Sequence, residues 1–124
     1  MHPTLSHIET TLRAILLQHC PPLQVQVDTA INYEVRGTKP CMQGKTKVSG
    51  IYFASVVPKP KDIRFYFFPN YTHPAAFADD FPAIRKSLKG KSCFHIKSLT
   101  PEIETELAAM VQKGVQLFEK EGWL

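Results

Sequence analysis

The chain has 124 residues, of which 44% are hydrophobic and 21% are charged, and its formal net charge at pH 7 is +4. This length is enough for one domain with one core. No apolar run approaches the roughly 20 residues that a membrane-spanning helix needs. We therefore expect one soluble domain over residues 1–124 that does not enter a membrane.

Cysteine usage and the start of the chain indicate a cellular compartment. The three cysteines, at positions 20, 41 and 93, form no Cys-x-x-Cys pair of the kind that binds zinc or exchanges disulfides. We interpret them as ordinary small apolar residues. The first seven residues lack the basic and apolar regions of a signal peptide, so we expect a cytoplasmic protein with reduced thiols.

The first third of the chain predicts a helix followed by extended structure. Residues 6–9 match the capping box of a helix start, and apolar residues then recur at helical spacing until Pro21-Pro22 ends the helix. Alternating apolar residues over 23–35 predict a strand, although residues 28–34 are also compatible with a helical turn.

Two stronger strands are predicted at residues 47–57 and 62–68, which are rich in β-branched and aromatic side chains. The proline-rich segment between them predicts a turn, and therefore an antiparallel hairpin. Both faces of the second strand carry bulky residues. We expect each face to be covered at least in part, and one face to pack on the helices.

The last third predicts a short helix, a strand and a long helix. Residues 73–82, interrupted by proline, are compatible with a short helix along the sheet edge, and residues 93–97 predict a strand with Phe94 and Ile96 inward. Thr100 is the expected N-cap of the final helix. Its predicted buried stripe is Ile103, Leu107, Met110, Gly114 and Leu117, with Phe118 beside them and Gly122 as the stop. This order favours an α+β two-layer sandwich, an antiparallel sheet covered by an N-terminal and a C-terminal helix.

No stretch carries a catalytic signature. Two Gly-Lys-Ser/Thr tripeptides, at residues 44–46 and 90–92, lack the upstream glycine of a phosphate-binding loop. The five histidines have no metal-ligand spacing, and no nucleophile elbow or close carboxylate pair is present. We therefore expect a protein that is not an enzyme.

Charge is distributed unevenly along the chain. Residues 39–97 carry a net charge of +8, against −1 for residues 1–38 and −3 for residues 98–124. A basic region with interleaved aromatic residues suits phosphates or single-stranded bases. Lysines at sheet edges also serve solubility and block edge pairing. We favour the solvated surface, which makes nucleic acid the weaker alternative as a partner.

Five residues are candidates for holding a ligand. On the sheet these are Tyr33, Tyr52 and Arg64, because aromatic and guanidinium groups hold ligands. An anionic ligand would need lysines such as Lys91 and Lys97, and its binding would weaken steeply with salt. We expect a monomer or a homodimer.

Several blocks together resemble the YdhG-like family of small bacterial domains of unknown function. They are Ala30-Ile31-Asn32-Tyr33, the segments 61–69 and 88–97, and Gly122-Trp123. The chain departs from the family at Glu34, where members often have glycine, and at Asp62, where they often have histidine. The resemblance implies a frataxin-like sandwich and, for some members, the role of an intracellular iron chaperone.

An iron carrier would need carboxylate ligands that hold the metal loosely. Glu102 and Glu106, one turn apart on the final helix, are the metal candidates, although compensation of the helix dipole also explains them. Two hypotheses therefore remain. The first is a non-catalytic carrier with iron as its cargo, and the second is a module whose basic aromatic sheet binds an anionic ligand, a nucleic acid or a protein partner.

Overall fold

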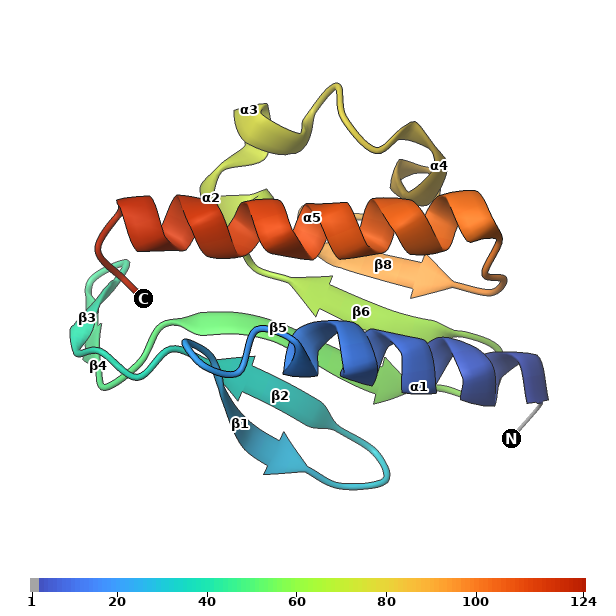
Figure 1. Cartoon of the computed structure of the whole chain (residues 1–124), viewed down its shortest axis with the longest axis horizontal. Helices are drawn as coiled ribbons and strands as arrows, with labels where there is room; N and C mark the ends of the chain where they lie inside the picture. Colours follow the sequence, from blue (N-terminus) through green and yellow to red (C-terminus); the bar gives the residue numbers. More distant parts are fainter. Residues whose placement is uncertain (1–2) are drawn as a thin grey trace.

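A computed structural model describes residues 3–124 and contains a six-stranded antiparallel sheet with two long helices on one face (Figure 1). The strand order is β1-β2-β5-β6-β8-β7. Helices α1 and α5 lie side by side over this sheet. The predicted α+β sandwich, covered by an N-terminal and a C-terminal helix, is confirmed.

The elements have the following bounds. The helices are α1 (Pro3–Leu17), α2 (Pro69–Thr72), α3 (Pro74–Phe77), α4 (Pro82–Arg85) and α5 (Pro101–Lys120). The strands of the main sheet are β1 (Gln24–Asp28), β2 (Tyr33–Arg36), β5 (Tyr52–Pro58), β6 (Ile63–Phe67), β7 (Leu88–Lys89) and β8 (Cys93–Ile96). A separate hairpin consists of β3 (Cys41–Gln43) and β4 (Thr46–Val48).

The core lies between the sheet and the two long helices. Alternate residues of β6 face the helices and are fully buried, as their spacing predicted. Phe53 of β5 meets Phe67 and Phe118 edge to face, with ring centroids 5.6 Å apart in each pair. Gly114 of α5 lies so close to the sheet that a Cβ there would come within 2.7 Å of the Phe67 ring. Helix α5 can therefore pack directly on the aromatic core.

The first helix begins earlier than predicted. Helix α1 starts at Pro3, so Ser6 lies inside the helix and the capping-box prediction is wrong. The cause is Leu5, which is buried and extends the apolar stripe of Ile8 and Leu12 by one turn. Thr10 donates its hydroxyl to the Ser6 carbonyl oxygen over 2.9 Å, which is a contact of the helix interior.

Two predicted strands are each interrupted in the structure. The segment 23–35 forms β1 and β2, joined by a turn in which the Thr29 hydroxyl accepts from the amides of Ile31 and Asn32. The segment 47–57 is split between β4 and β5 at Gly50. A Cβ on Gly50 would lie 1.8 Å from the Gly37 carbonyl oxygen, so the two backbones cross where a regular strand could not continue.

The C-terminal third follows the sequence more closely. Strand β8 turns Phe94 and Ile96 inward as predicted, and α3 occupies the proline-interrupted segment. The Thr100 side chain caps α5 by accepting from the amide of Ile103 over 3.1 Å. Of the predicted stripe, Leu107, Met110, Gly114 and Phe118 are buried, whereas Ile103 and Leu117 are only partly buried. Val111 and Val115 are the further buried residues of this helix. Within residues 3–124, no helix is both long and apolar enough to span a membrane.

Candidate functional site

The structure separates the three candidate residues of the sheet. Tyr33 is buried and faces the helices, where the Arg13 guanidinium lies 4.8 Å from its ring centroid. Strand pairing places Tyr52 and Arg64 on the opposite, helix-free face. A site on that open face would therefore include Tyr52 and Arg64 but not Tyr33.

On the open face, Tyr52 belongs to a network of contacts in which the charge of Arg36 is neutralised by a carboxylate. Its hydroxyl donates to the Ser55 hydroxyl over 2.7 Å, and the Arg36 guanidinium lies 5.1 Å from its ring centroid. Arg36 in turn donates to a Glu34 carboxylate oxygen 2.7 Å away. Burial raises the pKa of Tyr52 to about 12, so this phenol is neutral at physiological pH. The network holds neighbouring strands together and leaves no uncompensated charge at Tyr52.

Arg64 is compensated in the same way. Its Nε donates to Asp62 over 3.3 Å, and the other Asp62 oxygen lies 3.6 Å from Nδ1 of His95. Asp62 is itself buried. Next to this group, burial raises the pKa of the Cys93 thiol, which keeps it protonated and weakens it as a nucleophile.

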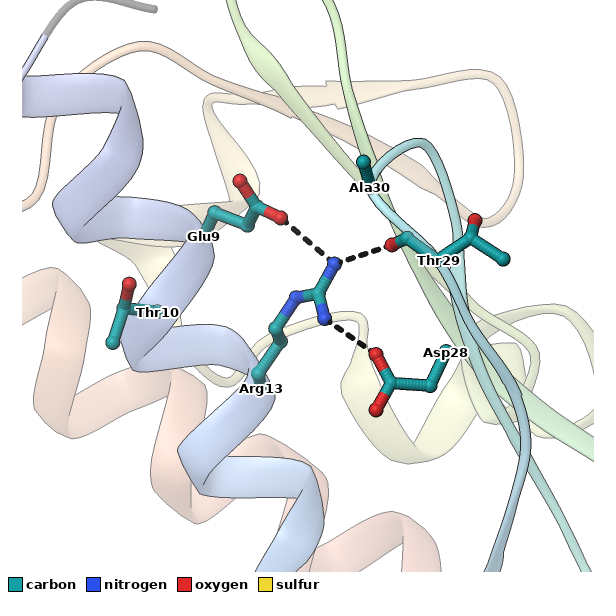
Figure 2. A pocket seen from close by; sticks show the side chains of 6 residues that line it. All are labelled: Glu9, Thr10, Arg13, Asp28, Thr29 and Ala30. Atoms are coloured by element: carbon teal, nitrogen blue, oxygen red, sulfur yellow. Dashed lines mark hydrogen bonds and ion pairs between the residues drawn. The ribbon is translucent and has the colours of Figure 1, made fainter.

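A first hollow, of about 450 Å³, lies between α1 and the β1–β2 turn (Figure 2). The Arg13 guanidinium points across it and bonds Glu9, Asp28 and the Thr29 carbonyl oxygen, each at 2.9 Å. We name these four residues the Arg13 clamp. Two carboxylates neutralise the one cation, so the clamp fastens the helix to the sheet edge and offers an anionic ligand no free charge.

A second hollow, of about 310 Å³, lies between α2 and the turn that joins β7 to β8. We name it the basic hollow. Its lining residues are Asn70, Tyr71, Pro74, Arg85, Leu88, Gly90 and Lys91. In Figure 1, the short helices that contribute to it lie on the side of α5 away from α1.

Hydrogen bonds and ring contacts fix the walls of the basic hollow. Asn70 donates its Nδ2 to the Lys91 carbonyl oxygen over 2.6 Å and so ties the turn to α2. Arg85 donates from Nη1 to the Phe77 carbonyl oxygen over 3.1 Å. The Tyr71 ring stacks on Phe68, with centroids 5.7 Å apart. The Lys91 ammonium lies 5.7 Å from the Tyr71 centroid.

The charge of the basic hollow is not compensated. Among residues 3–124, no carboxylate oxygen lies within 4 Å of the charged groups of Arg85 or Lys91. Arg85 also lines a neighbouring hollow with Asp79 and Asp80, but Asp80 binds Lys113 at 2.7 Å instead. Exposed lysines elsewhere also lack such partners. Arg85 and Lys91 share a concave surface whose lining has no carboxylate, whereas the hollow that Arg85 shares with Lys86 also contains Asp79 and Asp80.

The two predicted lysines lie far apart on the sheet. Lys91 precedes β8 and lines the basic hollow, whereas Lys97 follows β8 directly and is exposed at the opposite end of that strand. Sequence reasoning did not identify Arg85 or Tyr71. The one signal for Arg85 was the run of cations over residues 85–91, which has no acidic residue, and Tyr71 had no such signal.

The two metal candidates have different environments. Glu102 is exposed in the first turn of α5. Glu106 accepts from the amides of Ile84, over 2.9 Å, and Ala83, over 3.2 Å, so its carboxylate satisfies the start of α4. In the described part of the chain, no three His, Cys, Asp or Glu side chains form a group suited to a metal ion. The iron-carrier hypothesis stays a prediction.

Comparison with known proteins adds no relative to this picture. No protein-family model matches the chain, and no curated protein or solved structure matches it either. The resemblance to the YdhG-like family therefore stays a prediction.

Proposed function

We propose that this domain is a non-catalytic binding module that holds an anionic ligand in the basic hollow. One observation carries the proposal: Arg85 and Lys91 line the same concave surface, and neither has a carboxylate partner among residues 3–124. Cations gathered in a cleft concentrate anions from solution. The site differs from the open sheet face that the sequence suggested.

The two cations are suited to complementary tasks. A guanidinium presents several donors in a planar fork that matches carboxylate and phosphate oxygens, whereas an ammonium acts as a compact point charge. Arg85 uses Nη1 for the Phe77 carbonyl oxygen, which orients the rest of its fork. The Asn70 bond to the Lys91 carbonyl oxygen fixes the backbone from which the second cation extends. Both donors are therefore partly organised before a ligand arrives.

The test is an NMR titration of the isotope-labelled chain with inorganic phosphate at low ionic strength. We expect shift changes centred on residues 70–71, 85 and 88–91, which weaken steeply as salt is added. Replacing both cations, as in Arg85→Gln with Lys91→Gln, should weaken binding by roughly tenfold or more, since hydrogen bonds to charged groups are the strong ones.

Lys97→Gln is the matched control, because Lys97 is an exposed lysine at the other end of β8. This variant should bind phosphate as the unchanged chain does. An equal loss in Lys97→Gln, or shift changes spread over all the lysines, would show that phosphate responds only to net charge, and the proposal would fail.

A further inference from the structure

We infer that the ligand of the basic hollow is a nucleoside monophosphate, with its phosphate held by Arg85 and Lys91 and its base against the ring of Tyr71. This inference rests on the proposed function and specifies the class of anion. Three features carry it: the size of the hollow, its mixed lining, and the position of Tyr71.

The size of the hollow limits the ligand to a small molecule. At about 310 Å³, it lies at the lower end of the roughly 300–1,000 Å³ that small-molecule sites occupy. This size suits a ligand no larger than about one nucleotide. A nucleic acid strand would need a continuous track of free cations beside further aromatic rings. The rings of the open face do not provide one, because Arg36 and Arg64 are each paired with a carboxylate.

The lining combines charge with apolar surface. Pro74 and Leu88 stand in the same hollow as Arg85 and Lys91. An inorganic ion would contact the cations and leave the apolar wall in water. A phosphate ester of a planar heterocycle uses both parts of the surface, because the ring covers the apolar wall while the ester reaches the cations.

The ring of Tyr71 is suited to stacking against a base. It is 53% exposed, which sets it apart from the buried aromatic core. Its ring is held by Phe68 at an interplanar angle of 19°, so its orientation is fixed by the protein. Aromatic side chains fixed in this way support nucleobases, and removal of one such ring weakens binding by roughly tenfold. The Lys91 ammonium lies 5.7 Å from the centroid of the same ring, so a phosphate bound to Lys91 would stand close to a base on Tyr71.

The experiment compares four probes on the intact, isotope-labelled chain by NMR: inorganic phosphate, ribose 5-phosphate, adenosine and adenosine 5′-monophosphate. We expect the monophosphate to bind at least about tenfold more tightly than ribose 5-phosphate, because only the former has a base to stack. Tyr71→Leu, which keeps an apolar side chain but removes the ring, should abolish that difference and leave phosphate binding unchanged. Lys91→Gln should weaken all three phosphates and leave adenosine unaffected.

The outcomes separate this inference from the proposed function. Equal affinities for adenosine monophosphate and ribose 5-phosphate would overturn the nucleotide inference while the anion site stands. If no phosphate compound shifts the signals of the hollow, both fail. A short oligonucleotide is titrated as a fifth probe, and if it binds far more tightly than the mononucleotide, a strand-binding surface replaces the inference. Because Tyr71 is exposed, Tyr71→Leu should retain the dispersed spectrum of the folded chain, which the same measurement verifies.

Discussion

The Arg13 clamp and the basic hollow place a cation near a tyrosine ring in similar ways, yet they differ in what surrounds the charge. The Arg13 guanidinium lies 4.8 Å from the Tyr33 centroid, and the Lys91 ammonium lies 5.7 Å from that of Tyr71. Two carboxylates hold Arg13, whereas none lies near Lys91 among the described residues. The clamp therefore uses its charge within the fold, while the hollow keeps its charge available for a ligand.

A third pair supports the same distinction. Arg36 lies over the ring of Tyr52 and also binds Glu34, so it follows the pattern of the clamp. A cation beside an aromatic ring is thus no sign of a binding site by itself in this fold. A cation that has a nearby carboxylate makes a structural contact. A cation beside a ring without such a carboxylate among residues 3–124 is a candidate for ligand binding.

The largest effect is expected from Arg13→Met. This change keeps much of the apolar stem but removes the donors to Glu9, Asp28 and the Thr29 carbonyl oxygen. Because hydrogen bonds between charged groups are lost and two carboxylates are left close together, we expect the free energy of unfolding to fall by about 2 kcal/mol. Urea denaturation measures this change.

Phosphate binding to Arg13→Met, titrated under conditions where the variant is folded, should equal that of the unchanged chain. If the variant keeps full stability or loses phosphate binding, the proposed difference between the Arg13 clamp and the basic hollow is wrong. Arg13→Lys should lose less stability than Arg13→Met, because an ammonium keeps the charge but not the planar fork.

A smaller effect is expected from Glu106→Gln. The carboxylate accepts from two amides at the start of α4, and an amide side chain can replace only one of these bonds well. We expect a loss of about 1 kcal/mol in urea denaturation, comparable to the loss of a helix cap. The control is Glu102→Gln, whose exposed side chain should change stability by less than about 0.5 kcal/mol. Equal losses in the two variants would contradict the assigned contact.

The same two variants test the iron-carrier hypothesis. If the domain carries iron, an anaerobic Fe(II) titration should broaden NMR signals near Glu102 and Glu106, and either substitution should reduce that broadening. If Glu106 serves only as a contact to α4, Fe(II) should cause no localised broadening at residues 102–106. The stability and iron measurements therefore give independent answers from one pair of proteins.

The features that the sequence predicted well are local in origin. The alternation in β6 and the Thr100 cap of α5 depend on neighbours within a few residues, and both are confirmed. The partners of Arg13 and Glu106 could not be predicted, because Asp28 and Ile84 reach them only through the packing of separate elements. A sequence pattern shows which positions are charged, but it does not show which charged side chains come into contact.

The basic hollow illustrates the same limit. Lys91 was a candidate because of its place in a basic segment, but Tyr71 and Arg85 were not, since they lie in four-residue helices that give no periodic signal. Tyr33 was grouped with Tyr52, although strand pairing places Tyr33 on the face that meets the helices and Tyr52 on the opposite face. The bend at Gly50 depends on a tertiary contact with Gly37, whereas the turn at Thr29 is made by local hydrogen bonds that an alternating apolar pattern does not reveal.

The smallest effect at neutral pH concerns Tyr52, whose contacts on the open face can also be examined by changing the pH. Burial raises the pKa of this phenol from 10.0 to about 12, so the folded state retains a proton that the unfolded state releases. The resulting stability is complete below pH 10 and is lost as pH rises through 12, by about 1.4 kcal/mol per pH unit between these values.

Absorbance at 295 nm, followed while circular dichroism shows the sheet intact, should reveal one tyrosine that ionises near pH 12 in the unchanged chain. Tyr52→Phe should remove that step and, at neutral pH, cost only about 0.5–1 kcal/mol, the value of one hydrogen bond to Ser55. Burial also raises the pKa of Tyr33, which lies under Arg13. Burial raises the pKa of Tyr66 on the open face as well. A late step that persists in Tyr52→Phe would therefore assign the protected phenol to Tyr33 or Tyr66, and Tyr52 would then be less enclosed than its contacts indicate.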